Sequence, residues 1–221
     1  NGSLNPRMRV EDLVAEPLLI HTDMSPAERM KVAHELLQVV GLGAKHAHRF
    51  PHEFSGGQRQ RIGIARALTV RPKLIIADEP VSSLDVSIQA QVLNLMQQLQ
   101  RDYDLTYMFI SHDLSVVEMI SDRIAVMYLG SIVELAEKKE LYAHPRHPYT
   151  KALLSAVPIP DPTVQKGHAL LEGDIPSTID LPVGCPFQTR CPRCQDDCKL
   201  KPIEPVDVGG GHMVACLHME E

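Results

Sequence analysis

A hydroxyl, two glycines and a side-chain amide follow one another at Ser55, Gly56, Gly57 and Gln58. Apolar residues recur at helical spacing directly after them, so these four residues are predicted to begin a helix. Free backbone N–H groups and the positive end of the helix dipole favour an anion there, and a phosphate oxygen is the natural occupant. The same residues also form a plain capping box, in which Ser55 and Gln58 only open the helix. Taken alone, they do not separate these two interpretations.

A pair of adjacent acids follows the apolar run of residues 74–77. Asp78 comes directly after this run and Glu79 is next. One carboxylate can hold Mg²⁺ through water while the other polarises an attacking water, and in-line phosphoryl transfer needs both roles. The alternative is a strand end that carries two solvated acids. A further acid, Asp85, is expected to cap the next helix, and this structural role is compatible with a functional one.

One histidine lies where α/β sheets gather ligand-binding residues. His112 follows a second predicted strand over residues 105–110, and such sheets bind ligands at the carboxyl ends of their strands. His112 is therefore a candidate for contact with a γ-phosphate. A lone histidine is more often a structural or surface residue, so this role depends on the order of the motifs. The other histidines, including His46, His48 and His52, are predicted to be surface or helix-end residues and not metal ligands.

Helix signals dominate the first quarter of the chain. Ser25, Pro26 and Glu28 have the types and spacing of a capped helix start. Apolar residues then recur at helical spacing until Gly41 ends the run. Residues 1–53 are therefore predicted to be mostly helical.

Helix and strand signals alternate in the next segment, which indicates α/β architecture. The helix that begins at Ser55 is expected to stop near Arg71, because a proline follows. Residues 74–77 and 105–110 are short and apolar, as is typical of buried strands in a parallel sheet. The apolar stripe over residues 88–99 predicts the helix between them.

A hairpin is predicted beyond this segment, with its turn at Leu129, Gly130 and Ser131. The composition shifts near Glu140, where prolines become dense, and all five cysteines lie after this point. Such a loop-rich tail has a small core, so we expect more than apolar packing to hold it.

The whole-chain composition excludes several classes of protein. The 221 residues are 44% hydrophobic, which is ample for a globular core, and no apolar stretch approaches the roughly 20 residues that span a bilayer. A net charge of −6 argues against a nucleic-acid surface. No G-x-x-x-x-G-K-[S/T] phosphate loop occurs in the sequence. Because the sequence also starts inside a turn cluster at Asn1, we expect it to be part of a longer chain.

The order of these motifs resembles that of ABC transporter ATPases. Ser55 to Gln58 look like the signature, Asp78 and Glu79 like the Walker B acids, Asp85 like the D-loop acid and His112 like the switch histidine. Residues 3–7, 111–117 and 147–154 are further similar to the oligopeptide/dipeptide (peptide/nickel) importer family, and most of all to its dipeptide-type second ATPase. The resemblance covers essentially the whole chain.

This resemblance implies an α/β fold, the C-terminal part of a P-loop ABC ATPase domain with a small Cys-rich extension. It divides the chain into a helical subdomain over residues 1–53, the ATPase core from signature to switch over residues 54–140, and a peptide-importer extension over residues 141–221. The implied activity of the intact protein is ATP hydrolysis that powers import of di- or oligopeptides. Without a phosphate loop, the 221 residues alone are expected to be inactive.

The resemblance also implies roles for single residues. In this family two ATPase subunits sandwich ATP, so Ser55, Gly56, Gly57 and Gln58 would serve the partner's nucleotide. On the nucleotide bound in cis, Asp78 would hold Mg²⁺, Glu79 would be the catalytic carboxylate and His112 would sense the γ-phosphate, with Asp85 also at the site.

The implied partners are a second ABC ATPase subunit, two permease subunits and an extracytoplasmic peptide-binding protein that acts through them, with no nucleic acid. The implied location is peripheral, on the cytoplasmic face of the cell membrane.

The five cysteines are separated by five, two, three and seventeen residues. Disulfides fit poorly, because the count is odd and such an ATPase faces a reducing compartment. A four-thiolate site for zinc or an iron–sulfur cluster fits better, and the spacing alone does not choose the metal. The structural alternative is that these are free thiols, buried as small hydrophobic side chains without a metal. The resemblance assigns a [4Fe–4S] cluster to Cys185, Cys191, Cys198 and Cys216, and leaves Cys194 as the additional thiol.

Two other functions remain open. One is a docking and metal-binding module without nucleotide turnover. A non-transport ABC ATPase is the other, and it is disfavoured by the importer-like segment over residues 147–154 and by the lack of a basic or coiled-coil insertion.

Overall fold

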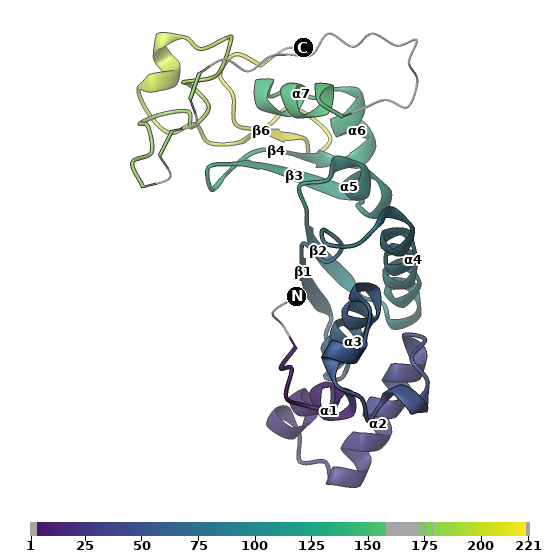
Figure 1. The fold of residues 1–221 in the computed structure, drawn as a ribbon. Helices are drawn as coiled ribbons and strands as arrows, with labels where there is room; N and C mark the ends of the chain where they lie inside the picture. Colours follow the sequence, from purple (N-terminus) through teal and green to yellow (C-terminus); the bar gives the residue numbers. More distant parts are fainter. Residues whose placement is uncertain (1–3, 158–172, 175, 178, 220–221) are drawn as a thin grey trace. The chain divides into compact units, whose positions relative to one another are not determined.

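The computed structural model describes residues 4–157, 173–174, 176–177 and 179–219, drawn in colour in Figure 1. Ser3, which belongs to the importer-like segment 3–7, and residues 158–172 of the predicted extension lie outside the described residues. The chain divides into two compact units, Asn1–Asp113 and Leu114–Glu221. Each unit is described by itself.

The first unit begins with helices, as predicted. α2 opens with the expected capping box, in which Ser25 Oγ accepts from the Glu28 N–H at 3.4 Å and Glu28 Oε2 accepts from the Ser25 N–H at 2.7 Å. Gly41 follows this helix with a φ of 80°, a left-handed conformation that glycine adopts without cost. The helical elements of the unit are α1 (Val10–His21), α2 (Pro26–Val39), the 3₁₀ turns Ala44–His46 and Pro51–Glu53, α3 (Gly56–Leu68) and α4 (Val86–Tyr103).

Two parallel strands complete the first unit. β1 (Leu74–Asp78) pairs with β2 (Thr106–Ile110), with Leu74 opposite Thr106 and Asp78 opposite Ile110. This confirms the predicted parallel strands, whose connection through α4 is the usual one in α/β folds.

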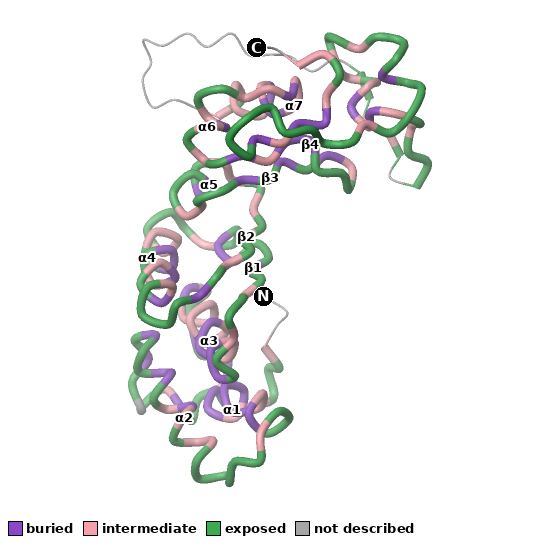
Figure 2. Tube along the Cα trace, turned by 180° about the vertical axis from the view of Figure 1, so that it is seen from behind, coloured by how far each residue is buried: buried purple, intermediate pink, exposed green. Residues whose placement is uncertain are grey.

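The burial predicted for these strands is wrong on one face. α3 and α4 lie to one side of the strand pair (Figures 1 and 2). On the other face Leu74 is 53% exposed, Ile76 63% and Met108 54%. An apolar strand sequence is typical of a sheet covered on both faces, but within the described residues only one face of this pair is covered.

An antiparallel sheet is the centre of the second unit. The predicted hairpin is confirmed: its two turn residues, Leu129 and Gly130, have φ angles of 46° and 79°, as in the two-residue turns that match strand twist. The strands lie in the order β3-β4-β6-β5. The elements of the unit are α5 (Leu114–Ile120), β3 (Arg123–Tyr128), β4 (Ser131–Glu137), α6 (Lys138–Ala143), α7 (Pro148–Ser155), the 3₁₀ turn Asp196–Lys199, β5 (Val206–Asp207) and β6 (Met213–Val214).

Aromatic packing ties the cysteine-rich segment to this sheet. The Phe187 side chain is fully buried, and its ring centroid lies 5.2 Å from that of Tyr128 on β3 and 5.3 Å from that of Tyr149 on α7. Buried aromatic groups of this kind contribute large apolar areas to a small core. The tail is therefore held partly by apolar packing.

A buried carboxylate adds a polar anchor in the same unit. Glu134 on β4 is fully buried and accepts from the N–H groups of Arg146 and His147 at 2.7 and 3.0 Å. Its Oε1 also lies 2.7 Å from Nε2 of His212, which is itself buried. A buried charge is tolerated when it is paired and hydrogen-bonded in this way. Glu134 thus joins β4, the start of α7 and the turn before β6.

Candidate functional site

Glu79 and His112, which lie 33 positions apart in the sequence, are brought together at the carboxyl ends of β1 and β2. Glu79 Oε1 lies 3.0 Å from His112 Nδ1. The Glu79 N–H donates to the Ile110 carbonyl at 2.9 Å, so the parallel pairing of the strands continues one residue past Asp78. The strand register therefore sets the distance between the two predicted catalytic side chains.

The backbone at Glu79 is unusual for a residue with a side chain. Its φ is 45°, in the left-handed region that non-glycine residues seldom adopt. Strained conformations of this kind gather at functional sites. The carbonyl of Glu79 accepts from the Ser82 hydroxyl at 3.2 Å, which holds the turn that follows.

The Glu79 carboxylate is charged and open to ligands. The hydrogen bond with His112 lowers the pKa of Glu79 below its ordinary value of 4.5, against a smaller desolvation effect that raises it. The Glu79 side chain is 50% exposed and that of His112 is 73% exposed. Asp78, at the end of β1, is also exposed. These groups suit metal binding and water activation, and their roles remain predictions.

The start of α3 forms the capping box that the sequence predicts. Ser55 Oγ accepts from the Gln58 N–H at 3.3 Å, and Gln58 Oε1 accepts from the Ser55 N–H at 3.1 Å. The N–H groups of Gly56 and Gly57 have no acceptor within the helix, as in the first turn of any α-helix. The cap is thus confirmed, and it leaves two donors at the helix start for the predicted anion.

The two glycines have a second role that sequence reasoning missed. A Cβ added at Gly57 would lie 2.3 Å from Ile88 Cγ2, and one at Gly56 would lie 3.0 Å from Leu84 Cδ2. The start of α3 therefore packs tightly against the start of α4. The contact joins residues far apart in the sequence, so no local signal indicates it.

Asp85 caps α4 as expected. Its Oδ1 accepts from the Ile88 N–H at 3.0 Å and from the Ser87 hydroxyl at 2.8 Å. The Ser87 hydrogen bond is the main cause of the lowered pKa of Asp85, followed by the bond from the Ile88 N–H. The capping role is confirmed, and the role of Asp85 at a nucleotide remains a prediction.

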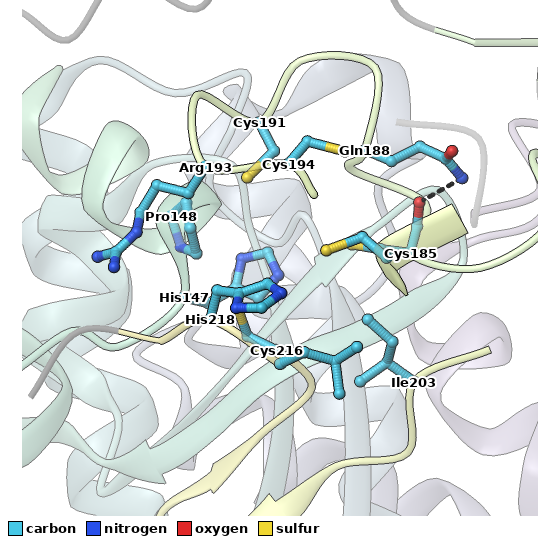
Figure 3. A pocket seen from close by; sticks show the side chains of 12 residues that line it. His147, Pro148, Cys185, Gln188, Cys191, Arg193, Cys194, Ile203, Cys216 and His218 are labelled. Atoms are coloured by element: carbon cyan, nitrogen blue, oxygen red, sulfur yellow. Dashed lines mark hydrogen bonds between the residues drawn. The ribbon is translucent and has the colours of Figure 1, made fainter. Parts of the chain in front are cut away.

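All five cysteines line one small cavity of about 10 Å³ in the second unit, and Figure 3 shows several of them around it. Cys185 and Cys198 are buried, and the Cys185 N–H donates to the Cys198 carbonyl at 2.8 Å. Gly184 has a φ of 93°, and a Cβ there would lie 2.2 Å from the Cys198 carbonyl oxygen. A glycine is needed at this position for the two loops to meet.

The chemistry of this cavity fits a thiophilic metal. The pKa of Cys185 is raised to about 11, mainly by burial and to a smaller extent by the neighbouring thiols Cys191, Cys216 and Cys198. Burial is also the main cause of the raised pKa of Cys191, Cys194 and Cys216. Sulfur ligands suit zinc or an iron–sulfur cluster, whose positive charge stabilises thiolates. Of the five cysteines, however, Cys198 alone belongs to the group of ligand atoms that lie within 4.8 Å of one another among the described residues. Cys194 lines the same cavity as the four predicted ligands, so the structure does not set it apart.

Sequence reasoning missed two residues beside the cysteines. His218 Nε2 lies 2.8 Å from Asp197 Oδ1 and 3.0 Å from Oδ2. A nitrogen of His218, a carboxylate oxygen of Asp197 and Cys198 Sγ all lie within 4.8 Å of one another. Asp197 and His218 lie 21 positions apart in the sequence, so no local spacing signal indicates the pair.

The histidine predictions are partly wrong. His147 caps α7, accepting from the Tyr149 N–H at 3.1 Å, which agrees with a helix-end role. His212 is buried against Glu134 and is not a surface residue. His48 Nδ1 lies 2.6 Å from Glu11 Oε1.

The described part of the chain contains no helix that is both long and apolar enough to cross a bilayer.

Two family models match the chain. The model of the ABC transporter family matches residues 1–82, and that of the oligopeptide/dipeptide transporter C-terminal region matches residues 133–198. Among solved structures, the dimeric structure of MJ0796, a bacterial ABC transporter cassette, is 31% identical with a TM-score of 0.54, over 61% of this chain and 59% of that one. A post-hydrolysis structure of the same cassette, bound to ADP and Pi, matches equally well. The fold is thus that of an ABC ATPase cassette.

Curated proteins match almost the whole chain. It is 54% identical to the oligopeptide transport ATP-binding protein OppF of Escherichia coli, over 99% of this chain and 66% of that protein. It is 55% identical to AppF of Bacillus subtilis, over 97% and 66%, and 53% identical to a putative peptide import ATP-binding protein of Brucella ovis, over 98% and 68%. The chain thus spans about two thirds of the length of these relatives. It belongs to the family of oligopeptide/dipeptide ABC transporter ATP-binding proteins.

Proposed function

We propose that this chain is part of an ATP-hydrolysing subunit that powers the import of di- or oligopeptides. The observation that carries the proposal is the 3.0 Å contact between Glu79 and His112 at the carboxyl ends of two parallel strands. Relatives above 50% identity are named oligopeptide transport ATP-binding proteins, which supports the same substrate class.

Each side chain at the strand ends has a distinct role in this proposal. Glu79, held as a carboxylate by His112, accepts a hydrogen bond from the attacking water and increases its nucleophilicity. Asp78 would hold Mg²⁺ through water, and the ion would supply charge neutralisation at the phosphates. His112 contacts Glu79 through Nδ1 and directs Nε2 to the γ-phosphate. His112 would thus link the carboxylate to the phosphate.

The start of α3 serves a second nucleotide in this proposal. Ser55, Gly57 and Gln58 present a hydroxyl, a backbone N–H and an amide at a helix N-terminus, where a phosphate is favoured. Because Gly56 and Gly57 pack against α4, the helix start is held at a fixed position relative to Asp85. The phosphate bound there would belong to a second ABC ATPase subunit, and the similar MJ0796 cassette is itself described as dimeric.

The remaining partners follow from the family. We expect two permease subunits and an extracytoplasmic peptide-binding protein that acts through them, and we propose a peripheral position on the cytoplasmic face of the membrane. The net charge of −6 gives no support to a nucleic-acid partner.

Replacement of Glu79 by Gln tests the ATPase proposal. The amide keeps the shape of the side chain but loses the charge that polarises water, so we expect steady-state ATP hydrolysis by the assembled transporter to fall about 10²- to 10⁴-fold. Glu140→Gln is a matched control, because Glu140 is also an exposed glutamate paired with a histidine, His144, at 3.2 Å. Undiminished hydrolysis in Glu79→Gln would show that Glu79 is not the catalytic carboxylate.

The cysteine-lined cavity is proposed to hold a metal. Cys185, Cys191, Cys198 and Cys216 are the proposed ligands of a [4Fe–4S] cluster or a zinc ion, with Cys194 as an additional thiol in the same cavity. When bound, the metal crosslinks loops that share a small core. Anaerobic purification followed by metal analysis should find about one zinc ion or one cluster per chain. Absence of iron and zinc, with all five thiols reactive in the native protein, contradicts this site.

A second candidate function is a docking and metal-binding module without nucleotide turnover. It is favoured by the cavity that all five cysteines line in the second unit. Equilibrium dialysis of this chain with Mg-ATP separates the two candidates. Micromolar binding by these residues rules out the second candidate, and a lack of binding supports it for the chain taken alone.

A further inference from the structure

A histidine beside the cysteine-lined cavity is held in one orientation by a carboxylate. Both oxygens of Asp197 lie within 3.0 Å of His218 Nε2, so this ring nitrogen is taken and Nδ1 is the nitrogen left for another partner. The His218 side chain is 23% exposed and lines the cavity together with the five cysteines. Figure 3 shows its ring beside Cys216, at the cavity.

Three side chains beside the cavity, those of Asp197, Cys198 and His218, bring possible metal-ligand atoms close together. Ligand atoms of His218 and Cys198 lie within 4.8 Å of each other. Nitrogen and sulfur ligands on one tetrahedral zinc ion lie roughly 3.5 Å apart, and the 4.8 Å limit is compatible with two ligands of one ion. A histidine that binds a metal through one nitrogen usually donates its other N–H to a carboxylate, as His218 does to Asp197.

The other histidine at the cavity is already engaged. His147 Nδ1 accepts from the Tyr149 N–H and caps α7, and the ring is almost completely buried. Asp197 and Cys198 lie on one 3₁₀ turn, whereas Cys216 and His218 lie two residues apart after β6. A metal bound by both segments would join them at one point.

We propose that His218, oriented by Asp197, is a metal ligand of the cysteine-lined cavity and gives it a mixed sulfur and nitrogen donor set suited to a zinc-type divalent ion. The inference rests on the metal site proposed above. Because a structural zinc ion takes four donors, His218 would bind in place of one of the four cysteines that the family resemblance assigns. Cys₃His sets are among the usual structural zinc sites.

Cadmium-113 NMR of the full chain tests the inference directly. With ¹⁵N-labelled histidine, the wild-type protein loaded with ¹¹³Cd²⁺ should show coupling between the metal and one nitrogen of His218. This readout needs no variant, so a failure to fold does not obscure it. Bound cadmium with no coupling to His218 overturns the proposal.

Metal-affinity measurements on variants provide a second test of the inference. His218→Ala should weaken Co²⁺ and Zn²⁺ binding at least 10-fold and change the visible spectrum of bound Co²⁺, and Asp197→Asn should weaken binding about 10- to 100-fold. His144→Ala, which removes a histidine paired with Glu140 outside the cavity, should have no effect. If His218→Ala keeps the wild-type metal affinity and the wild-type Co²⁺ spectrum, His218 is not a ligand, although the metal site itself can still exist. If the wild-type chain binds neither metal while Cys198→Ser also changes nothing, the metal site itself fails.

Discussion

At the scale of single residues, the candidate site depends on one backbone angle and one side-chain contact. The left-handed φ of 45° at Glu79 comes at the end of β1, where the carboxylate meets His112. Hydrogen bonding by His112 lowers the pKa of Glu79, so the group is ionised at neutral pH. A second carboxylate, that of Asp78, lies at the same strand end.

Asp85 allows the cap and the charge to be tested separately. Asp85→Ala removes the acceptor of the Ile88 N–H and should lower the free energy of unfolding, whereas Asp85→Asn should keep it because asparagine caps helices equally well. We expect ATP hydrolysis by the assembled transporter to survive Asp85→Asn if the residue acts only as a cap. Denaturant titration and ATPase assays of both variants measure the two effects. Equal stability of Asp85→Ala and wild type would contradict the capping role.

Among the elements, α3 and α4 pack closely where Gly57 meets Ile88. Gly57→Ala places a Cβ 2.3 Å from Ile88 Cγ2, so we expect it to lower the free energy of unfolding by about 1–3 kcal/mol. Gly63→Ala is the matched control in the same helix, because a Cβ there meets nothing within 4 Å. It should stabilise the protein by up to about 1 kcal/mol through helix propensity. Denaturant titration compares the two.

A double variant identifies the cause of the Gly57 effect. If the clash with Ile88 is responsible, adding Ile88→Ala to Gly57→Ala should cost less than the sum of the two single changes. Strict additivity would assign the loss to the helix backbone instead.

A buried carboxylate joins the elements of the helical segment. Glu11 on α1 lies 2.8 Å from His34 on α2 and 2.6 Å from His48. Burial raises the pKa of Glu11, but the hydrogen bonds from His34 and His48 outweigh it and the pKa is lowered from 4.5. A carboxylate with a lowered pKa contributes stability that is present above its unfolded pKa and lost as the pH falls through its folded value.

The free energy of unfolding should therefore decrease as the pH falls below about 4.5, and Glu11→Gln should reduce that dependence. At neutral pH the same change should cost about 1–2 kcal/mol, because it weakens two hydrogen bonds of a buried group. Denaturant titrations at several pH values measure both effects. Glu35→Gln, an exposed change on α2, is the control. An unchanged acid slope in Glu11→Gln would assign it to other groups.

At the scale of the whole molecule, the two units are expected to respond differently to metal removal. The proposed metal ligands all lie in the unit Leu114–Glu221, whose loops share a small core. A ligand at 100 times its Kd stabilises the folded state by about 2.7 kcal/mol, and chelation removes that contribution. Hydrogen exchange should therefore increase over residues 185–219 and stay unchanged in α1, α2 and α3. Equal changes in both units would contradict a site confined to the second unit.

The sequence alone determined the features that are encoded within a few residues of each other. The capping boxes at Ser25 and Ser55, the hairpin turn at Gly130 and the parallel strands were all predicted from local signals. Caps, turns and apolar periodicity act through the backbone of a single segment, so their sequence signals are local. The order of the motifs also indicated the family to which the chain belongs.

Only the tertiary structure decided the contacts between distant segments. It placed His112 against Glu79, Ile88 against Gly57 and His218 against Asp197, and it left Ile76 exposed on a strand predicted to be buried. These features depend on strand register and on the distance between packed elements. Neither quantity is encoded by residue type at one position, because both arise from the packing of the whole unit.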